Sequence, residues 1–564
     1  MVPEGPIFAG FLHNYRLGAR LSMTSSEQPG PGKDAAEPVE SDGRVARRGF
    51  FLISGAKLWF LVCSALLNLA LPRIFGGPVL YGEYAVVNTF ISILNMVMVT
   101  GALQGVSKRV SERPEHARAV RSRALVIQSW LGGAVFVALI SGATAIATYL
   151  FQDAQLASYV RIAAIVTLSY AWYAAMIGVL NGLKRFGAQA LFDVIFATLK
   201  CGLMVILVLA GMGVAGAFWG FALAAVVVMV GSVVVTGRMT RGGESPAEPP
   251  ALLGFMSQVM GYVLFINVLL QIDVVVIKGA ALAGVEQLLA NGGAELPWVQ
   301  QLMSRALEAG ETLTGTQVTS ALAGIFRATK VVSLLPYQAV IAITFVAFPL
   351  ISRATFSEDA EATRATVRAA LRAAAILVAL LATGVGAGGV DLLVTLFGAS
   401  YGLASVALAP LLFAMGLFAL LYVLLSVLTA AGRPGDALWL SGMAAAAHVG
   451  VLYGVVSTTE PGLDLLRYAS WAVLGVTAGT WFLATVVLNR RCGVRFPWLA
   501  MGRVALACAV SAGIVQAMGG EGLALAIARM GVAALAYGGM LLLTREVKGD
   551  EVRLVLSALR IRRG

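Results

Sequence analysis

Apolar stretches of about twenty residues or more follow one another from residue 50 to residue 544 of this 564-residue chain. A helix of about twenty apolar residues spans the hydrocarbon core of a bilayer, whereas membrane barrels alternate apolar and polar residues. The sequence is only 12% charged, against roughly one quarter in soluble domains. We therefore predict an all-α polytopic membrane protein. It has fourteen expected spans: 50–71, 84–106, 124–150, 158–181, 188–211, 214–237, 256–278, 325–351, 373–396, 403–431, 437–457, 467–488, 500–519 and 523–544.

The Lys and Arg residues are unevenly distributed between the two sets of loops that alternate along the chain. Most of the 41 basic residues fall in the N-terminal tail, the C-terminal tail and every second loop between spans. Cytoplasmic loops carry an excess of Lys and Arg. An even number of spans returns the chain to its starting side, so both termini are predicted to be cytoplasmic.

Two halves of the chain repeat each other. The third span is followed by LFQDAQLASY and the ninth by LFGASYGLAS; the fourth ends in VLNGLKRFGAQAL and the tenth in VLTAAGRPGDAL. Since six spans bring the chain back to one side, the halves are expected to be parallel repeats. The predicted organisation is a disordered cytoplasmic tail (1–47), an N-lobe (48–237), a cytoplasmic linker (238–255), a C-lobe (256–457), the remaining helices (458–544) and a basic cytoplasmic tail (545–564).

An outer insertion, residues 279–324, interrupts the second half. It holds four Glu residues and a single basic residue, Arg305. Pro297 opens the segment WVQQLMSRALEAG, which places Trp298, Leu302 and Ala306 or Leu307 on one helical face. We expect a short amphipathic helix at the outer membrane interface; the alternative is a partly ordered loop without a role.

The eighth predicted span carries a polar stripe. Arg327, Lys330, Ser333 or Leu334, Tyr337, Ile341 and Thr344 recur at three- or four-residue intervals and share one face, while the opposite face is apolar. Such a helix is predicted to line an aqueous, cation-rich cavity. The alternative is that both charges lie at the membrane edge and extend into water.

Similar stripes occur in spans 1, 2 and 7, and span 5 places Asp193 and Lys200 near one face. Because a charge at the bilayer centre costs at least about 2.5–3.5 kcal/mol, these groups are expected to face each other or water, around a shared cavity at the interface of the two halves. The alternative for the Asn residues is hydrogen bonding between helices.

Asp273 is a candidate ion-coupling site, or part of a structural ion pair beside Lys278. The candidate substrate-binding residues are Lys57, Asn68, Asn88, Asn95, Lys278, Arg327 and Lys330.

The charges on these stripes indicate the kind of ligand. Lys and Arg outnumber the acidic residues and form charge-assisted hydrogen bonds with phosphate, and apolar surroundings suit a lipid tail. The expected ligand is an anionic lipid head group.

The four cysteines lack metal-ligand spacing and are expected to be packing thiols without a disulfide, so no metal or cofactor is predicted. GxxxxGK[ST] does not occur, so transport is expected to draw on ion gradients, membrane potential or downstream consumption of the product.

Four segments carry a family resemblance: PRIFGGPVLYGEYAVV (72–87), LQGVSKRVSE (103–112), QIDVVVIKG (271–279) and FRATKVVSLLPYQAVIAITFVAFPLISR (326–353). In these the chain resembles the O-antigen-type polysaccharide flippases of the multidrug/oligosaccharidyl-lipid/polysaccharide exporter superfamily. In that family Lys330 matches a basic residue early in the eighth helix. The related lipid II flippases carry a Ser-Arg pair and Gly-Phe-x-Arg in span 1, where this chain reads WFLVCSALLN.

The resemblance implies a transporter rather than an enzyme. Members of the family move polyprenyl-pyrophosphate-linked oligosaccharides to the outer leaflet of the bacterial inner membrane, by alternating access around a cationic cavity, for the synthesis of surface polysaccharides such as the O-antigen of lipopolysaccharide. The implied partners are the lipid-linked oligosaccharide, membrane lipids and other polysaccharide-assembly proteins, with no nucleic acid.

Three alternatives are left open. One is a lipid II flippase. The second is a cation-coupled multidrug exporter, which would favour an acidic cavity. The third is a membrane glycan polymerase or ligase, which would favour basic or His residues in a large outer loop; residues 279–324 are acidic and contain no His.

Overall fold

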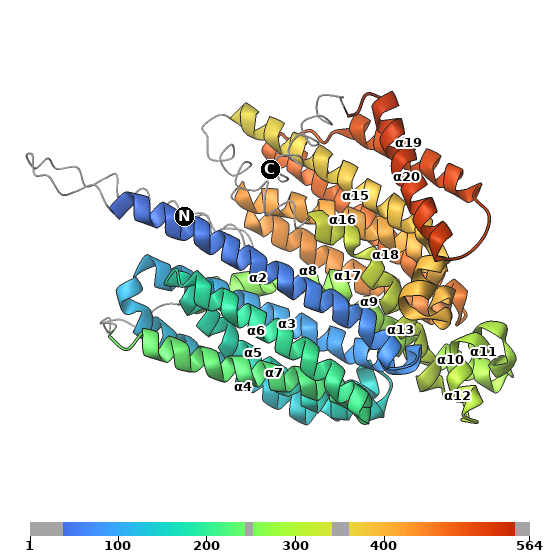
Figure 1. Cartoon of the computed structure of the whole chain (residues 1–564), viewed down its shortest axis with the longest axis horizontal. Coiled ribbons are helices and arrows are strands. Elements are labelled where there is room, and N and C mark those ends of the chain that lie inside the picture. Colours follow the sequence, from blue (N-terminus) through green and yellow to red (C-terminus); the bar gives the residue numbers. More distant parts are fainter. Residues whose placement is uncertain (1–37, 243–251, 341–359, 432, 548–564) are drawn as a thin grey trace, which may run out of the picture. The chain divides into compact units, whose positions relative to one another are not determined.

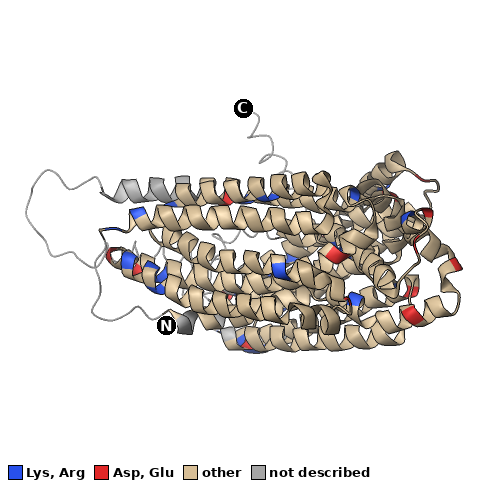
Figure 2. Cartoon of the chain, turned by 90° about the horizontal axis from the view of Figure 1, so that it is seen from below, with Lys and Arg blue, Asp and Glu red and all other residues tan. Residues whose placement is uncertain are grey.

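The computed structural model describes residues 38–242, 252–340, 360–431 and 433–547, and the regular structure of these residues is all helical (Figure 1). Twelve of the described helices are long and apolar enough to cross a membrane. The number is thirteen if the bent pair Val259–Gln271 and Asp273–Ala290, which meet at 57°, counts as one span. The predicted all-α membrane class is therefore confirmed. Figure 2 shows long uncharged stretches along the helices, with only scattered acidic and basic residues between them.

One of these twelve, Phe186–Met239, is 54 residues long. A straight helix of that length would extend about 80 Å, against a hydrocarbon core of about 30 Å. The chain breaks at Gly211 and Gly213, whose φ angles of 88° and 55° favour glycine. α6 (Phe186–Leu207) and α7 (Gly213–Met239) then lie side by side, so close that a Cβ on Gly220 would approach the Met204 nitrogen to 2.6 Å (Figure 1). This segment therefore accounts for two predicted spans, and each of the fourteen has a helical counterpart.

The helices form two compact units. The first unit holds α2 (Pro38–Ile74), α3 (Pro78–Glu112), α4 (Ala117–Ala145), α5 (Ala157–Gly182), α6, α7, α8 (Leu253–Gln271), α9 (Asp273–Ala280), α10 (Leu282–Ala290) and α12 (Ser304–Glu308). The second holds α11 (Pro297–Leu302), α15 (Ala360–Phe397), α16 (Ser405–Ala430), most of α17 (Pro434–Thr458), α18 (Leu463–Cys492), α19 (Trp498–Gln516) and α20 (Leu523–Leu543). α13 (Gly315–Ser333) belongs to the first unit up to Gly324 and to the second from Ile325.

The seventh predicted span lies in the first unit, although the sequence placed it in the C-lobe. α8 packs against a glycine-lined face of α3: a Cβ on Gly101 would lie 2.4 Å from Cγ of Met260, and one on Gly105 would lie 2.5 Å from Cγ of Met256. Flexible methionines fill such a groove well. This contact attaches the start of the second repeat to the first unit.

The internal repeat is visible in the backbone. Gln152 and Gly398 occupy equivalent positions after the two LF pairs, and both have positive φ angles, 54° and 114°. Arg185 and Arg433 also correspond, and each donates its backbone N–H to the carbonyl oxygen of the residue five positions earlier, at 2.8 Å and 3.0 Å. The equivalent turns therefore share their local geometry, as expected of parallel repeats.

Several predicted boundaries differ from the observed ones. α2 begins at Pro38, so residues 38–47 are helical rather than disordered; proline suits the first position of a helix. α13 begins at Gly315 instead of 325, and the rest of that span, 341–351, lies outside the described residues. The outer amphipathic segment is two short helices, α11 and α12, separated at Met303, with Val299 and Leu302 buried. The sidedness of the termini stays a prediction.

The C-terminal helices are attached to α15 by ion pairs near both of its ends. Glu546, only 4% exposed, accepts hydrogen bonds from Arg372 of α15 at 2.6 Å and from Arg503 of α19 at 2.9 Å. Asp391 of α15 accepts from the Gly522 backbone N–H at 2.9 Å and from Arg529 of α20 at 3.3 Å. The start of the predicted basic tail is thus part of the folded second unit; residues 548–564 lie outside the described residues.

Candidate functional site: the charged groups within the helices

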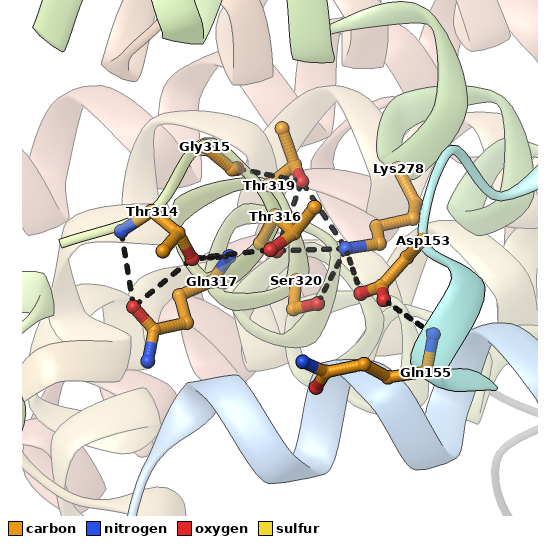
Figure 3. Close-up of polar contacts among 9 residues, drawn as sticks. All are labelled: Asp153, Gln155, Lys278, Thr314, Gly315, Thr316, Gln317, Thr319 and Ser320. Atoms are coloured by element: carbon orange, nitrogen blue, oxygen red, sulfur yellow. Dashed lines mark hydrogen bonds and ion pairs between the residues drawn. The ribbon is translucent and has the colours of Figure 1, made fainter. Parts of the chain in front are cut away.

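Lys278, at the end of α9, is fully buried in the first unit. Its ammonium group lies between the α4–α5 turn and the first turns of α13 (Figure 3). An ammonium has three protons to donate, and here four oxygens lie within hydrogen-bonding range. They are Asp153 Oδ2 at 2.9 Å, the Thr316 carbonyl oxygen at 2.7 Å, Ser320 Oγ at 2.8 Å and Thr319 Oγ1 at 3.3 Å.

Asp153 supplies the carboxylate of this Lys278 cluster. It lies in the turn that follows α4, directly after Gln152 with its positive φ angle. Its Oδ1 accepts the backbone N–H of Gln155 at 3.2 Å, which fixes the side chain at the start of the next helical turn (Figure 3). Glu83 of α3 interacts electrostatically with both Asp153 and Lys278. The Asp153 carboxylate therefore balances the lysine charge within the first unit.

The helix that supplies Thr316, Thr319 and Ser320 is also fixed by a close backbone crossing. A Cβ on Gly82 of α3 would lie 1.7 Å from the Ser320 carbonyl oxygen, and one on Gly324 of α13 would lie 2.2 Å from that of Pro78. Small residues at such crossings let two helices approach closely in a membrane. The crossing and the Lys278 cluster together hold the first turns of α13 against α3 and α9.

A second charged cluster joins α2 to α6 in the first unit. Nζ of Lys57 lies 2.8 Å from Oδ2 of Asp193, whose Oδ1 accepts the Tyr173 hydroxyl at 3.3 Å. The Lys57 side chain is 48% exposed, whereas that of Asp193 is 9% exposed. Lys200 lies 3.8 Å from the ring centroid of Phe221, an arrangement that favours cation–π attraction. Lys57 and Lys278 thus have carboxylate partners on different elements, and these contacts do not bring the two lysines together.

The asparagines of the predicted stripes differ in their surroundings. Asn68 of α2 donates to the carbonyl oxygen of Ser64 in its own helix at 2.8 Å. Asn88 of α3 is half-buried. Asn95 of α3 is 4% exposed, and its Oδ1 accepts no hydrogen bond from any residue that the structure describes. Of the three, Asn95 carries the polar group that most requires a partner.

The two cations of α13 lie one helical turn apart. Lys330 is fully buried and Arg327 is half-buried. The buried ammonium of Lys330 therefore reaches neither water at the membrane edge nor an aqueous cavity in this conformation. Tyr337, predicted to follow on the same face, packs edge-on against Phe418 with ring centroids 5.2 Å apart.

Asp273 is the first residue of α9 and is fully buried. Its Oδ1 accepts the backbone N–H of Val274 at 2.9 Å. The carboxylate that the structure places on Lys278 is that of Asp153, a residue that the sequence analysis did not single out. One signal was available: Asp153 occupies the repeat position where the second half has Ala399. A charge at a position that is apolar in the other repeat indicates a role specific to one half.

Comparison with known proteins agrees with this architecture. The structure is similar to the lipid II flippase MurJ in an inward closed conformation, with a TM-score of 0.65, 12% identity, and coverage of 88% of this chain and 99% of that chain. It is also similar to an outward-facing multidrug resistance MATE family transporter (TM-score 0.48, 15% identity, 79% and 95% covered) and to a MOP superfamily transporter from Pyrococcus furiosus (0.49, 14%, 79% and 95%). No curated protein matches the chain.

The fold, with its buried charges, is that of a polytopic helical membrane protein similar in architecture to MurJ. The sequence model of the family described as "Polysaccharide biosynthesis protein" matches residues 48–355. The chain belongs to this family. A membrane flippase or transporter is the class of protein that the family and the fold support.

Proposed function

We propose that the protein is a flippase that moves a polyprenyl-pyrophosphate-linked oligosaccharide from the cytoplasmic to the outer leaflet of the bacterial inner membrane by alternating access, for surface polysaccharide synthesis such as that of O-antigen and lipopolysaccharide. It acts as a transporter and not as an enzyme. The observation that carries the proposal is the burial of Lys330, with Arg327 one turn away, in a chain of the polysaccharide biosynthesis family. An ionisable residue buried within a membrane helix is by default a candidate for a functional site.

The roles of the candidate residues differ in this proposal. Arg327 and Lys330 of α13 bind the pyrophosphate, and Asn88 and Asn95 of α3 contact sugar hydroxyls. Lys278 is saturated by four oxygens and acts by holding α13 in place. Lys57, paired with Asp193, and Asn68, bonded within its own helix, are further candidate substrate contacts on α2. Asp273 is the proposed ion-coupling carboxylate.

The proposal is tested by flipping in proteoliposomes with a fluorescent polyprenyl-pyrophosphate oligosaccharide as substrate. We expect Lys330→Ala to lower the initial rate about tenfold or more, because a hydrogen bond to a charged group contributes about 1.5–3 kcal/mol. Lys330→Arg should retain part of the rate. The matched control is Arg467→Ala, which removes an arginine that is 49% exposed and paired with Asp464 on α18; its rate should stay within about twofold of wild type. Wild-type flipping by an Arg327→Ala, Lys330→Ala double variant would contradict the assignment.

Competing substrates separate the proposal from its alternatives. Flipping of lipid II at a higher rate than the oligosaccharide-linked lipid would identify a lipid II flippase. Export of a lipophilic cation without lipid flipping would identify a multidrug exporter. Transfer of glycan to an acceptor by the purified protein would indicate a polymerase or ligase.

The membrane potential provides a further expected result. An inside-negative potential favours outward movement of a pyrophosphate-like charge of −2 by about 4–5 kcal/mol per 100 mV if that charge crosses without a counter-ion. Outward flipping should therefore accelerate when a potassium diffusion potential, negative inside, is imposed on the proteoliposomes. A rate independent of potential would mean that the charge is neutralised during transit.

A further inference from the structure

We propose that Cys63 of α2 and Cys201 of α6 form an oxidisable thiol pair, which a two-electron oxidant such as a membrane quinone converts into a disulfide joining the two helices. The proposal concerns the first unit alone and does not depend on the substrate proposed above. The chain holds four cysteines, and all four are free thiols in the structure.

The register of α2 against α6 brings these two positions together. Lys57 pairs with Asp193 at 2.8 Å, and the rings of Phe60 and Phe196 stack with centroids 6.2 Å apart. Residue numbers rise together along both helices, so α2 and α6 run parallel, as they do in Figure 1. One further turn along this register brings Cys63 opposite the turn that holds Cys201.

The side chains complete this approach. Cys63 is 5% exposed and lies on the buried stripe of α2 with Ala56 and Leu67. Cys201 is half-buried on α6, and the two thiols interact electrostatically. A disulfide needs a sulfur–sulfur distance of about 2.05 Å, and the register places the two side chains on neighbouring turns of adjacent helices. The indole of Trp59, which donates to Thr198 Oγ1 at 3.0 Å, further fixes the two helices in this register.

The oxidation balances with the oxidant named. Each thiol loses one proton and one electron, the two S–H bonds break, and one S–S bond forms. A quinone accepts the two electrons and two protons and becomes a hydroquinone. An apolar quinone reaches thiols within the bilayer, whereas glutathione is confined to water.

The consequence is a covalent restraint on α2. The apolar stretch of this helix, Leu52–Ile74, has few buried residues, and its polar contacts to α6 include the Lys57–Asp193 ion pair and the Trp59–Thr198 hydrogen bond. A disulfide at Cys63 would add a covalent bond, which is stronger than the Lys57–Asp193 ion pair and the Phe60–Phe196 contact. The oxidised protein therefore has α2 fixed to α6, and the reduced protein has it held only by non-covalent contacts.

The test counts free thiols in the full-length protein in membrane vesicles. Vesicles are treated with diamide or with a short-chain benzoquinone whose ring is fully substituted, so that it oxidises thiols and does not alkylate them. They are then denatured in detergent and labelled with a maleimide polymer that shifts the gel mobility once per thiol. The wild type, with four cysteines, should lose two labels, and a thiol reductant should restore them. Cys63→Ser and Cys201→Ser variants should each lose none, whereas Cys508→Ser, which removes a buried thiol of α19, should still lose two.

Peptide mass spectrometry of the oxidised wild type provides a readout that does not require the variants to fold. A disulfide-linked peptide pair containing Cys63 and Cys201, within one chain, supports the proposal. Retention of all four labels, a disulfide between two chains, or a linked pair containing Cys492 or Cys508 would overturn it.

Discussion

Replacement of Asp153 by alanine is expected to lower the free energy of unfolding by about 3–5 kcal/mol, because it leaves the ammonium of Lys278 buried without its carboxylate. The lysine side chain has no exposed surface, and its remaining hydrogen-bond partners, Thr316, Thr319 and Ser320, are uncharged. Neutral oxygens stabilise an ammonium less than a carboxylate does. A second substitution, Lys278→Met, should recover much of the loss, since an apolar side chain of similar length removes the uncompensated charge.

Detergent-induced unfolding, followed by circular dichroism, measures these differences. The matched control is Asp464→Ala, which breaks the Arg467–Asp464 pair; both of those side chains are largely exposed, at 49% and 61%. Exposed pairs contribute at most about 1 kcal/mol. Equal effects of Asp153→Ala and Asp464→Ala would contradict a stabilising role for the buried pair. So would a double variant no more stable than Asp153→Ala alone.

Substitution of Gly82 by alanine is expected to destabilise the first unit by about 3 kcal/mol, at the upper end of overpacking effects. A Cβ at this position would lie 1.7 Å from the Ser320 carbonyl oxygen, and backbone atoms cannot move aside as the end of a flexible side chain can. The helices α3 and α13 would have to separate, which would also move Ser320 away from Lys278. Gly324→Ala should have a similar effect, since its Cβ would lie 2.2 Å from the Pro78 carbonyl oxygen.

Gly133→Ala is the matched control for this experiment. Gly133 lies within α4, and no atom lies within 4 Å of its added Cβ. Alanine in place of glycine inside a helix is expected to stabilise it by about 0.5–1 kcal/mol. Opposite signs for Gly82→Ala and Gly133→Ala, measured by the same unfolding assay, are the expected result. Equal stability of the two variants would mean that α3 and α13 do not cross as closely as described.

The span positions could be predicted because hydropathy alone determines them. Each predicted span has a helix, and the repeat inferred from LFQDAQLASY and LFGASYGLAS reappears as two turns with a positive φ angle at the same position. The start of α13 was placed too late, at 325, because Thr316, Thr319 and Ser320 lower the local hydropathy. Those residues lie inside the fold because their oxygens accept hydrogen bonds from the buried ammonium of Lys278.

The partners of the buried charges could not be read from the sequence. Polar residues on one helical face show that a helix is amphipathic, but they do not say which helix lies opposite. The sequence places Asp193 and Lys200, seven positions apart, near one face of their helix. In the fold Asp193 pairs with Lys57 of α2, and Lys200 lies over the Phe221 ring. Lys278 likewise counted toward a cationic cavity, although Asp153 neutralises it. Counting the basic residues of the spans in the sequence therefore overestimates the positive electrostatic potential inside the helix bundle.

The pairing of α2 with α6 means that the first helix is synthesised well before its partner. Asp193 follows Lys57 by 136 residues, so translation at about 5–20 residues per second separates their synthesis by roughly 7–27 s. During that interval the first helix resides in the bilayer without the neighbour that neutralises its lysine. Lys57 lies near the start of the apolar stretch Leu52–Ile74, where its long side chain can reach the polar head groups. Nascent chains that stop before α6 therefore present an unassembled helix to the insertion and quality-control machinery.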